Sequence, residues 1–262
     1  MKRASMNDRR YERETAFHDK RFAESAPRPS EKFYSITHTT SKVFYRTYLT
    51  RHCFGSKVLE YGCGSDGHAL TLAKHGGRVV GIDISSVAVK LNRAAAARQP
   101  GGPIDFCVMN AEQLCFRNGT FDLICGMGIL HHLDLRRSYH ALSRALTPQG
   151  SAIFLEPLGH NPAINLYRHL TPTLRTPDEH PLLISDLEMA SEYFSSVELK
   201  YFHLTSLIAV AARRATWFDS AVSRLEQFDD FLFRRIPWTR KYAWAVAMVL
   251  SKPNDVKSTQ GM

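Results

Sequence analysis

Residues 58–67 read Val-Leu-Glu-Tyr-Gly-Cys-Gly-Ser-Asp-Gly, and this stretch decides the fold of the chain. An apolar strand ends in the acid Glu60 and opens into a glycine-rich turn and a helix. Because glycine has no Cβ, the backbone of such a turn can approach a nucleotide-like ligand closely. The spacing of Gly62, Gly64 and Gly67 also fits a dinucleotide fingerprint, which is weak evidence by itself. Glu60 would repel a dinucleotide pyrophosphate, whereas it favours a ligand with a cationic end.

The composition is that of one globular α/β domain with a helical elaboration. The chain has 262 residues, of which 44% are hydrophobic and 23% charged, enough to bury a substantial core. Residues 1–10 contain no apolar core, which argues against a secretory signal, and no apolar run reaches the roughly 18 residues that span a bilayer. The five cysteines have no zinc-ligand spacing and indicate reduced thiols, so we predict a cytoplasmic protein.

The net charge is +9 at pH 7, and the basic residues are dispersed along the chain. A net positive charge of this size is compatible with binding to nucleic acid, to an anionic membrane surface or to an anionic substrate. It is equally compatible with a role in solubility alone. The sequence has no RNA-module signature and no aromatic-basic repeat, which argues against a nucleic-acid partner.

From residue 57 onward, short apolar runs alternate with helical stretches. The expected strands are Lys57–Tyr61, Arg78–Ile84, Ile104–Met109, Phe121–Met127 and Ser151–Glu156. The expected helices between them are His68–His75, Ser86–Arg98 and Leu135–Leu146. Alternation at this spacing predicts a doubly wound parallel sheet.

The flanking segments add further expected elements. Two N-terminal helices, Asn7–Ala23 and Lys32–Thr50, are expected to pack over the ligand mouth. Residues 157–184 contain five prolines and form a long loop, as an acceptor lid would. Ser185-Asp186-Leu187-Glu188 is a capping box that predicts a helix start. A strand, a helical segment and a last strand are then expected, at Val197–Leu204, Leu207–Arg235 and Tyr242–Ser251.

These elements predict a chain of five parts. The parts are an N-terminal helical cap (1–52), a cofactor-binding core (53–158), an acceptor lid with a helix (159–190), the last two strands with a helical insert (191–251) and a flexible tail (252–262).

The motifs resemble, in order, those of class I S-adenosylmethionine-dependent methyltransferases of the type that includes quinone-biosynthesis and natural-product enzymes. The matching segments are Val58–Gly67, Val80–Ile84, Asn110–Phe116, and Phe121–Leu133 together with Leu146–Ser151. The resemblance covers roughly residues 55–158. It implies a Rossmann-like seven-stranded doubly wound sheet with an antiparallel last strand, and S-adenosylmethionine as the cofactor.

The resemblance also implies a role for each residue of the first two motifs. Glu60 is expected to hold the amino group of the methionine moiety, while Gly62, Gly64 and Gly67 admit the ligand. Asp83, 19 residues after Gly64, is expected to accept hydrogen bonds from both ribose hydroxyls. The alternative for Asp83 is an N-cap of the following helix.

Asn110, Ala111 and Met127 complete the expected cofactor site. The N–H of Ala111 can donate to an adenine ring nitrogen, and the side-chain oxygen of Asn110 can accept from the exocyclic amine. The family more often has aspartate at the position of Asn110, so we expect weaker adenine discrimination. Met127 is expected beneath the methionine arm or, alternatively, in the core at the strand end.

His131, His132 and Glu156 are the candidate catalytic residues. Methyl transfer from a sulfonium mainly requires alignment, but an oxygen or nitrogen acceptor can need a base, and imidazole is suited to that task near neutral pH. The histidine pair follows the fourth strand and Glu156 ends the fifth, at the edge where ligands bind such sheets. Alternatively, the histidines close a loop and Glu156 makes a structural hydrogen bond.

No metal site is predicted. Asp178, Glu179 and His180 are metal-binding types, but three consecutive residues cannot easily converge on one ion. Residues 204–250 interleave aromatic and arginine side chains. They predict either an amphipathic cover of the sheet edge or an apolar wall of the acceptor pocket whose basic rim associates weakly with anionic membrane.

The sequence therefore predicts a methyltransferase that acts on a small, partly apolar acceptor by in-line O- or C-methylation. A nucleic-acid methyltransferase is an alternative, although Gly126–His131 lacks the Asn/Asp-Pro-Pro-aromatic run of amino-methylating enzymes. An NAD-dependent oxidoreductase is disfavoured by Glu60 and by the absence of a hydride-transfer triad. A non-catalytic binding module on the same fold remains open, as does the oligomeric state.

Overall fold

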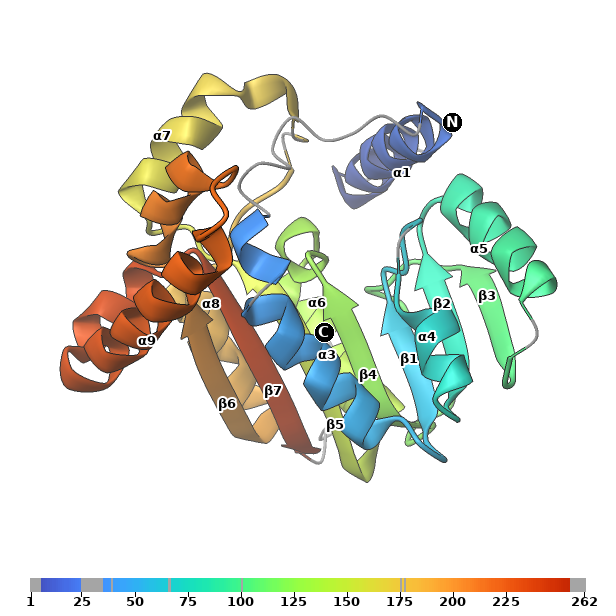
Figure 1. Cartoon of the computed structure of the whole chain (residues 1–262). Helices are drawn as coiled ribbons and strands as arrows, with labels where there is room; N and C mark the ends of the chain where they lie inside the picture. The colour runs from blue at the N-terminus through green and yellow to red at the C-terminus, as the bar shows by residue number, and fades with distance from the viewer. Residues whose placement is uncertain are drawn as a thin grey trace.

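A seven-stranded sheet organises the chain (Figure 1). The computed structural model describes residues 6–24, 35–38, 40–65, 67–99, 101–174, 176 and 178–254. The strands are β1 (Lys57–Tyr61), β2 (Arg78–Asp83), β3 (Ile104–Val108), β4 (Phe121–Met127), β5 (Leu146–Pro157), β6 (Phe194–Phe202) and β7 (Ala245–Pro253). Their order is β3-β2-β1-β4-β5-β7-β6, with β7 antiparallel to both of its neighbours. The predicted Rossmann-like sheet with an antiparallel last strand is confirmed.

Helices cover both faces of this sheet. The α-helices are α1 (Met6–Glu24), α3 (Ser41–His52), α4 (Ala69–Lys74), α5 (Ser86–Arg98), α6 (Leu135–Ala145), α7 (Pro162–Leu170), α8 (Ile184–Met189) and α9 (Phe218–Arg235). Short 3-10 segments are η1 (Ser35–His38), η2 (Leu130–His132), η3 (Pro172–Leu174), η4 (Ala190–Glu192), η5 (Ser206–Ala212) and η6 (Pro237–Tyr242). In the described part of the chain, no helix is long and apolar enough to cross a bilayer.

The core consists of two apolar layers, one on each face of the sheet. Tyr45 of α3 and Leu72 of α4 pack with Val58 on one face. Tyr139 of α6 and Leu187 of α8 pack with the other face. Because successive strand residues point to opposite faces, a strand such as β1 serves both layers, which explains its continuous burial after the first residue.

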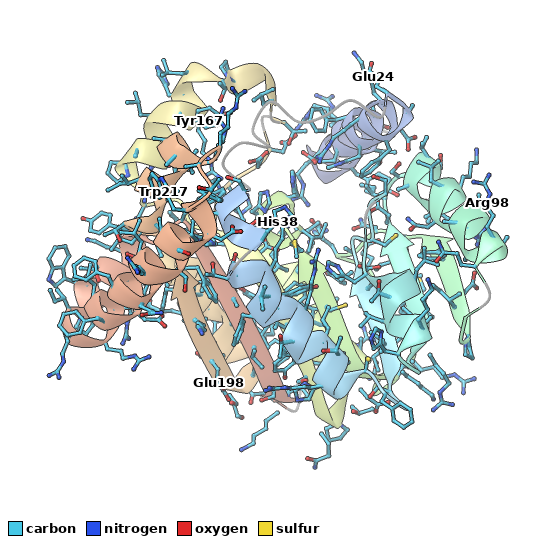
Figure 2. The ribbon with its side chains drawn as sticks, viewed as in Figure 1. Glu24, His38, Arg98, Tyr167, Glu198 and Trp217 are labelled. Atoms are coloured by element: carbon cyan, nitrogen blue, oxygen red, sulfur yellow. The ribbon has the colours of Figure 1, made fainter. Side chains whose placement is uncertain are left out.

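A third apolar cluster joins the segments outside the central sheet. It contains Ile36 of η1, Ile164 of α7, Val210 of η5 and Val222 of α9. Figure 1 shows α7 and α9 on the side of β6 and β7, away from α1 and α5. Trp217, which precedes α9, and Arg98, which ends α5, lie on opposite sides of the view in Figure 2.

The N-terminal expectations need one correction. The first helix is close to its predicted bounds, but the second, expected over Lys32–Thr50, is divided into η1 and α3, and residues 32–34 lie outside the described part. Moreover, α3 packs against the sheet beside β5 and β7 rather than over the ligand mouth. Its apolar residues Tyr45 and Leu49, one turn apart, require this buried position.

Three later segments also differ from expectation. The loop expected over residues 157–184 contains α7, whose first N–H groups are capped by Asn161 at 3.1 Å from both Ala163 and Ile164. The capping box expected at Ser185 is displaced, because the carboxylate of Asp186 accepts the N–H of Leu183 at 2.8 Å. The chain between β6 and β7 forms η5 and α9 as separate pieces rather than one helical segment.

Candidate active site

The glycine turn after β1 has the conformation that its sequence predicts. Gly62 and Gly64 have φ angles of +75° and +48°, a region that favours glycine. The N–H groups of Gly62 and Cys63 donate to the carbonyl of Ile82 at 3.0 and 2.8 Å, which ties the turn to the end of β2. A Cβ on Gly67 would lie 2.5 Å from the carbonyl oxygen of Cys63, so only glycine fits there.

Glu60 is buried beneath this turn, with 3% of its surface exposed. Its carboxylate accepts the N–H of Ala69 at 2.9 Å and also the N–H of His68, at the beginning of α4. Helix N-termini favour negative charge, so the acid stabilises the start of the helix. Since an ionised carboxylate offers about four acceptor sites, Glu60 retains capacity for a cationic ligand.

Asp83 links the tips of β1 and β2. Its two oxygens accept the N–H groups of Gly64 and Ser85, each at 2.8 Å. Burial raises the pKa of Asp83 and outweighs these two hydrogen bonds. The N-cap of α5 is Ser85, whose hydroxyl accepts the N–H of Ala88 at 3.1 Å. Asp83 is therefore not the N-cap, and it keeps acceptor capacity at the mouth of the turn.

The segments after β3 and β4 meet the same edge. The side-chain oxygen of Asn110 accepts the N–H of Glu112 at 2.9 Å, and the carbonyl of Ala111 accepts the hydroxyl of Tyr61. Met127 is half-buried at the end of β4. Four adjacent strands thus deliver the expected cofactor residues to one edge.

Glu156 and His131 form a buried pair at the end of β5. One oxygen of Glu156 accepts the N–H groups of Ile129 and Leu130 at 2.8 and 2.9 Å. The other lies 2.7 Å from Nδ1 of His131, and since a carboxylate can only accept, Nδ1 carries the proton. Burial lowers the pKa of His131, and the charge of His132 adds to this effect. The ring is therefore held neutral, with Nε2 as its basic nitrogen.

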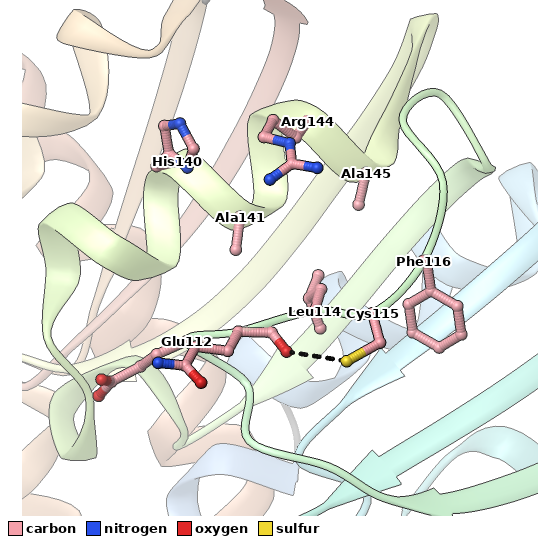
Figure 3. Close-up of a pocket in the computed structure, with 9 residues that line it drawn as sticks. Glu112, Leu114, Cys115, Phe116, His140, Ala141, Arg144 and Ala145 are labelled. Carbon is pink, nitrogen blue, oxygen red and sulfur yellow. Dashed lines mark hydrogen bonds between the residues drawn. The ribbon is translucent and has the colours of Figure 1, made fainter. Parts of the chain in front are cut away.

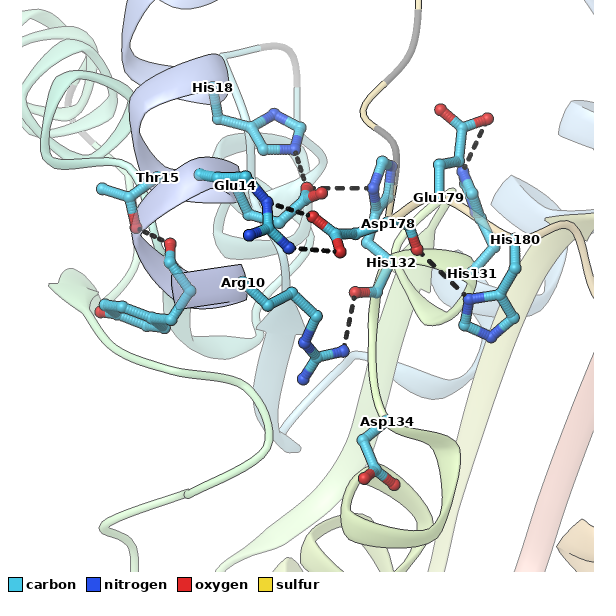
Figure 4. Close-up of polar contacts among 12 residues, drawn as sticks. Arg10, Glu14, Thr15, His18, His131, His132, Asp134, Asp178, Glu179 and His180 are labelled. Carbon is cyan, nitrogen blue, oxygen red and sulfur yellow. Dashed lines mark hydrogen bonds and ion pairs between the residues drawn. The ribbon is translucent and has the colours of Figure 1, made fainter. Parts of the chain in front are cut away.

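His132 points the other way, toward α1 (Figure 4). Its Nδ1 lies 3.2 Å from Oε2 of Glu14. Burial alone would lower the pKa of His132, but the interaction with Glu14 raises it above its ordinary value. The two adjacent histidines thus occupy opposite electrostatic environments, and His131 is the one whose neutral form is favoured.

Comparisons with known proteins decide between the remaining families. Residues 59–154 match the family model described as "Methyltransferase domain". A ubiquinone biosynthesis O-methyltransferase from Xanthomonas euvesicatoria pv. vesicatoria is 25% identical over 188 residues, covering 71% of this chain and 70% of the relative. One from Idiomarina loihiensis is 32% identical over 110 residues, covering 41% of this chain and 44% of the relative. These matches support a class I S-adenosylmethionine-dependent methyltransferase.

Solved structures agree on the fold. A Haemonchus contortus phosphoethanolamine N-methyltransferase aligns with a TM-score of 0.61 at 14% identity, over 85% of this chain and 57% of that one. Geranyl diphosphate C-methyltransferase from Streptomyces coelicolor aligns with a TM-score of 0.56 at 15% identity, over 80% and 74% of the two chains. These likenesses show the fold alone, and the methyltransferase domain together with the O-methyltransferase relatives supports an enzyme that uses S-adenosylmethionine.

In this methyltransferase, α1 lies across the carboxyl ends of β1–β4, and the sequence did not predict its contacts. Phe22 approaches Gly64, where an added Cβ would be 3.5 Å from its ring. Asp19 accepts hydrogen bonds from the hydroxyl of Ser85 and, at 3.3 Å, from the N–H of Val87. The C-terminal half of α1 therefore covers the glycine turn and the tip of β2.

The N-terminal half of α1 covers the ends of β3 and β4. Arg10 forms an ion pair with Glu112, and Arg13 forms two hydrogen bonds with Asp178 at 2.7 and 2.9 Å. The sequence does contain a pattern that indicates a polar face on this helix. Arg10, Glu14 and His18 are spaced by one helical turn, and all three side chains can carry a charge.

A cavity of about 290 Å³ lies elsewhere in the methyltransferase, between the segment after β3 and α6 (Figure 3). Its lining residues include Leu114 and Phe116 on one side and Ala141 and Ala145 on the other. It is lined by none of the predicted cofactor or catalytic residues, so it is separate from the candidate active site.

Proposed function

We propose that this methyltransferase methylates an oxygen of a small, partly apolar acceptor, with His131 as the general base. The observation that carries this proposal is the buried pair of His131 and Glu156, which lies at the same sheet edge as the glycine turn. The 2.7 Å contact fixes the ring, and the lowered pKa keeps it unprotonated at neutral pH. A carbon acceptor would use the same alignment without needing the base.

The cofactor residues are proposed in the roles that their positions favour. Glu60 faces the amino group of the methionine moiety, and Asp83 accepts the ribose hydroxyls. Asn110 and Ala111 face the adenine, and Met127 lies beneath the methionine arm. In support, both carboxylates keep unused acceptor sites.

S-adenosylmethionine, when bound, supplies a methyl group already activated by its sulfonium. The protein then aligns the acceptor with that methyl group, which is the main requirement of an in-line displacement. As the methyl group passed from sulfur to the acceptor oxygen, Nε2 of His131 would take the hydroxyl proton. Glu156 would stabilise the resulting imidazolium through its contact with Nδ1. This role accounts for a buried carboxylate next to the ring of His131.

The acceptor class is inferred from the relatives and from the insert. The relatives' names specify O-methylation in ubiquinone biosynthesis, which favours a hydroxyl acceptor here. The insert between β6 and β7 exposes Trp217, Phe231 and Trp238 at 58%, 54% and 67%. Arginines 213, 214 and 235 accompany them, so we propose a partly apolar acceptor and weak association with anionic membrane.

The test replaces the base and keeps the cofactor site. His131→Asn is expected to lower methyl transfer to a panel of alkyl-substituted catechols by about 10²–10⁴-fold. Its affinity for S-adenosylhomocysteine, measured by calorimetry, should stay within about threefold of the unmodified protein. His52→Asn is the matched control, because His52 is exposed and its ring bonds the carbonyl of Tyr48 and stacks on Tyr48 within its own helix. Full turnover in His131→Asn would show that alignment alone suffices and would remove the base assignment.

A further inference from the structure

Three side chains converge between α1 and the end of β4, outside the pair assigned to catalysis. Oε2 of Glu14 lies 3.4 Å from Nε2 of His18 and 3.2 Å from Nδ1 of His132. One ligand atom from each residue lies within 4.8 Å of the other two. Glu14 and His18 are one turn apart on α1, so both project from the same face of the helix (Figure 4).

Hydrogen bonding does not account for this cluster. Both carboxylate oxygens of Glu14 and Nδ1 of His132 are buried, and among the described residues none of the three atoms has a hydrogen-bond partner. Buried polar atoms are nearly always hydrogen-bonded, whereas these side chains meet at ion-pair distance without hydrogen-bond geometry, so the cluster needs an explanation. Glu14 is 5% exposed, so the cluster lies in the interior between α1 and the end of β4.

The distances between the ligand atoms of Glu14, His18 and His132 match those of a metal site. Zinc binds imidazole nitrogen and carboxylate oxygen at about 2.0–2.2 Å in a tetrahedral arrangement, which places neighbouring ligand atoms about 3.3–3.6 Å apart. The two measured separations, 3.2 and 3.4 Å, lie close to that edge length. Two imidazoles with one carboxylate suit zinc, cobalt or nickel, whereas calcium and magnesium prefer oxygen ligands.

We propose that Glu14, His18 and His132 bind one divalent transition-metal ion. Three protein ligands leave a fourth position open for water or another ligand, as in catalytic zinc sites. Beside the cluster, Nε2 of His131 lies 3.9 Å from Oε1 of Glu179, and these two residues form a second possible ligand group with His132. The ion would therefore sit next to the edge at which the acceptor is expected.

The ion would also fix α1 across the cofactor edge. Two ligands come from α1 and one from η2, so coordination joins the covering helix to the end of β4. Arg13 already contacts Asp178 nearby, but that ion pair is partly exposed and contributes little. This consequence rests on the proposed cofactor site beneath α1, whereas metal binding itself does not.

The experiment measures metal binding to the full chain directly. Chelator-treated protein is titrated with Zn²⁺ in a calorimeter, and Co²⁺ absorption reports the coordination geometry. We expect one equivalent with micromolar or tighter affinity and an intense visible band of tetrahedral Co²⁺. Glu14→Gln and His18→Ala should each weaken binding by at least about tenfold, while Glu12→Gln, an exposed acid on the same helix, should leave it unchanged.

Two further readouts keep the outcome unambiguous. Circular dichroism of the metal-free variants checks that each one folds. Hydrogen exchange of the α1 amides should slow when Zn²⁺ is added to the unmodified protein and not when it is added to Glu14→Gln. Absence of stoichiometric binding, or equal binding by the unmodified protein, Glu14→Gln and His18→Ala, would overturn the proposal. Because none of these readouts is methyl transfer, the result is independent of the proposed acceptor chemistry.

Discussion

Replacing Gly67 with alanine tests whether Glu60 is held as tightly as the structure indicates. The new Cβ would lie 2.5 Å from the carbonyl oxygen of Cys63 and 2.6 and 2.7 Å from the two oxygens of Glu60. The backbone cannot yield without disturbing the turn, so the carboxylate must move. It would then lose at least one of its bonds to the N–H groups of His68 and Ala69.

Loss of a hydrogen bond to a charged group costs about 1.5–3 kcal/mol, and crowding of a packed site costs a similar amount. We therefore expect Gly67→Ala to lower the free energy of unfolding by about 3–6 kcal/mol. At about 2–4 °C per kcal/mol, the melting temperature should fall by about 6–24 °C. Affinity for S-adenosylhomocysteine should fall as well, because Glu60 is displaced from the cofactor edge.

Gly101→Ala is the matched control for this substitution. Its added Cβ would meet no atom closer than 3.8 Å, so its stability should be unchanged or slightly raised. Thermal unfolding by circular dichroism and binding by calorimetry measure both effects. If Gly67→Ala is as stable as Gly101→Ala and binds the cofactor product equally well, the reasoning about Glu60 is wrong.

Three other predictions concern the ribose, the insert and the membrane. Asp83→Ala should weaken binding of S-adenosylmethionine by about 1.5–3 kcal/mol, or about 10–150-fold, and unchanged affinity in calorimetry would remove the ribose assignment. Asp229 is 1% exposed and accepts the N–H groups of residues 204, 205 and 206 at 2.9, 2.8 and 3.2 Å. Asp229→Ala should therefore cost about 2–4 kcal/mol in urea unfolding while leaving cofactor affinity intact, and a loss of affinity would contradict this separation. Sedimentation with anionic liposomes should show weak binding that salt abolishes, and no binding at low salt would leave the insert as a structural cover only.

The central sheet could be predicted closely from the sequence because local signals define it. β1, β4 and α5 have the bounds that their apolar runs and flanking turns indicate. Each of these elements lies between glycine- or polar-rich turns, and each strand is a short apolar run. Local pattern was therefore sufficient to place Glu60 and Asp83 at the ends of adjacent parallel strands.

The covering helix could not be placed in the same way. Its contacts join residues far apart in the chain, such as Arg10 and Glu112, which are 102 positions apart. The helical period shows which residues share a face, but it does not show what that face meets. The sequence could not distinguish the surroundings of His131 and His132 for the same reason, since Glu156 and Glu14, the neighbours that differ, are far away in the chain.

A buried polar network in the insert also had no sequence signal. Ser41 lies 2.8 Å from Nε2 of His203, and Nδ1 of the same ring lies 2.5 Å from Glu226. The arrangement resembles a hydrolytic triad, but Ser41 and His203 are fully buried, with 0% exposure. No substrate can reach the hydroxyl, so the network joins α3 to α9 as a structural link.

Hydrogen exchange with and without S-adenosylmethionine tests the central claim most directly. The claim is that the cofactor binds at the carboxyl edge formed by β1, β2, β3 and β4, with micromolar affinity. It predicts slower exchange in residues 62–68, 83–88 and 127–132 when the cofactor is present, and unchanged exchange in residues 140–145 beside the separate cavity. Protection confined to residues 140–145, or no protection at saturating cofactor, would contradict the account.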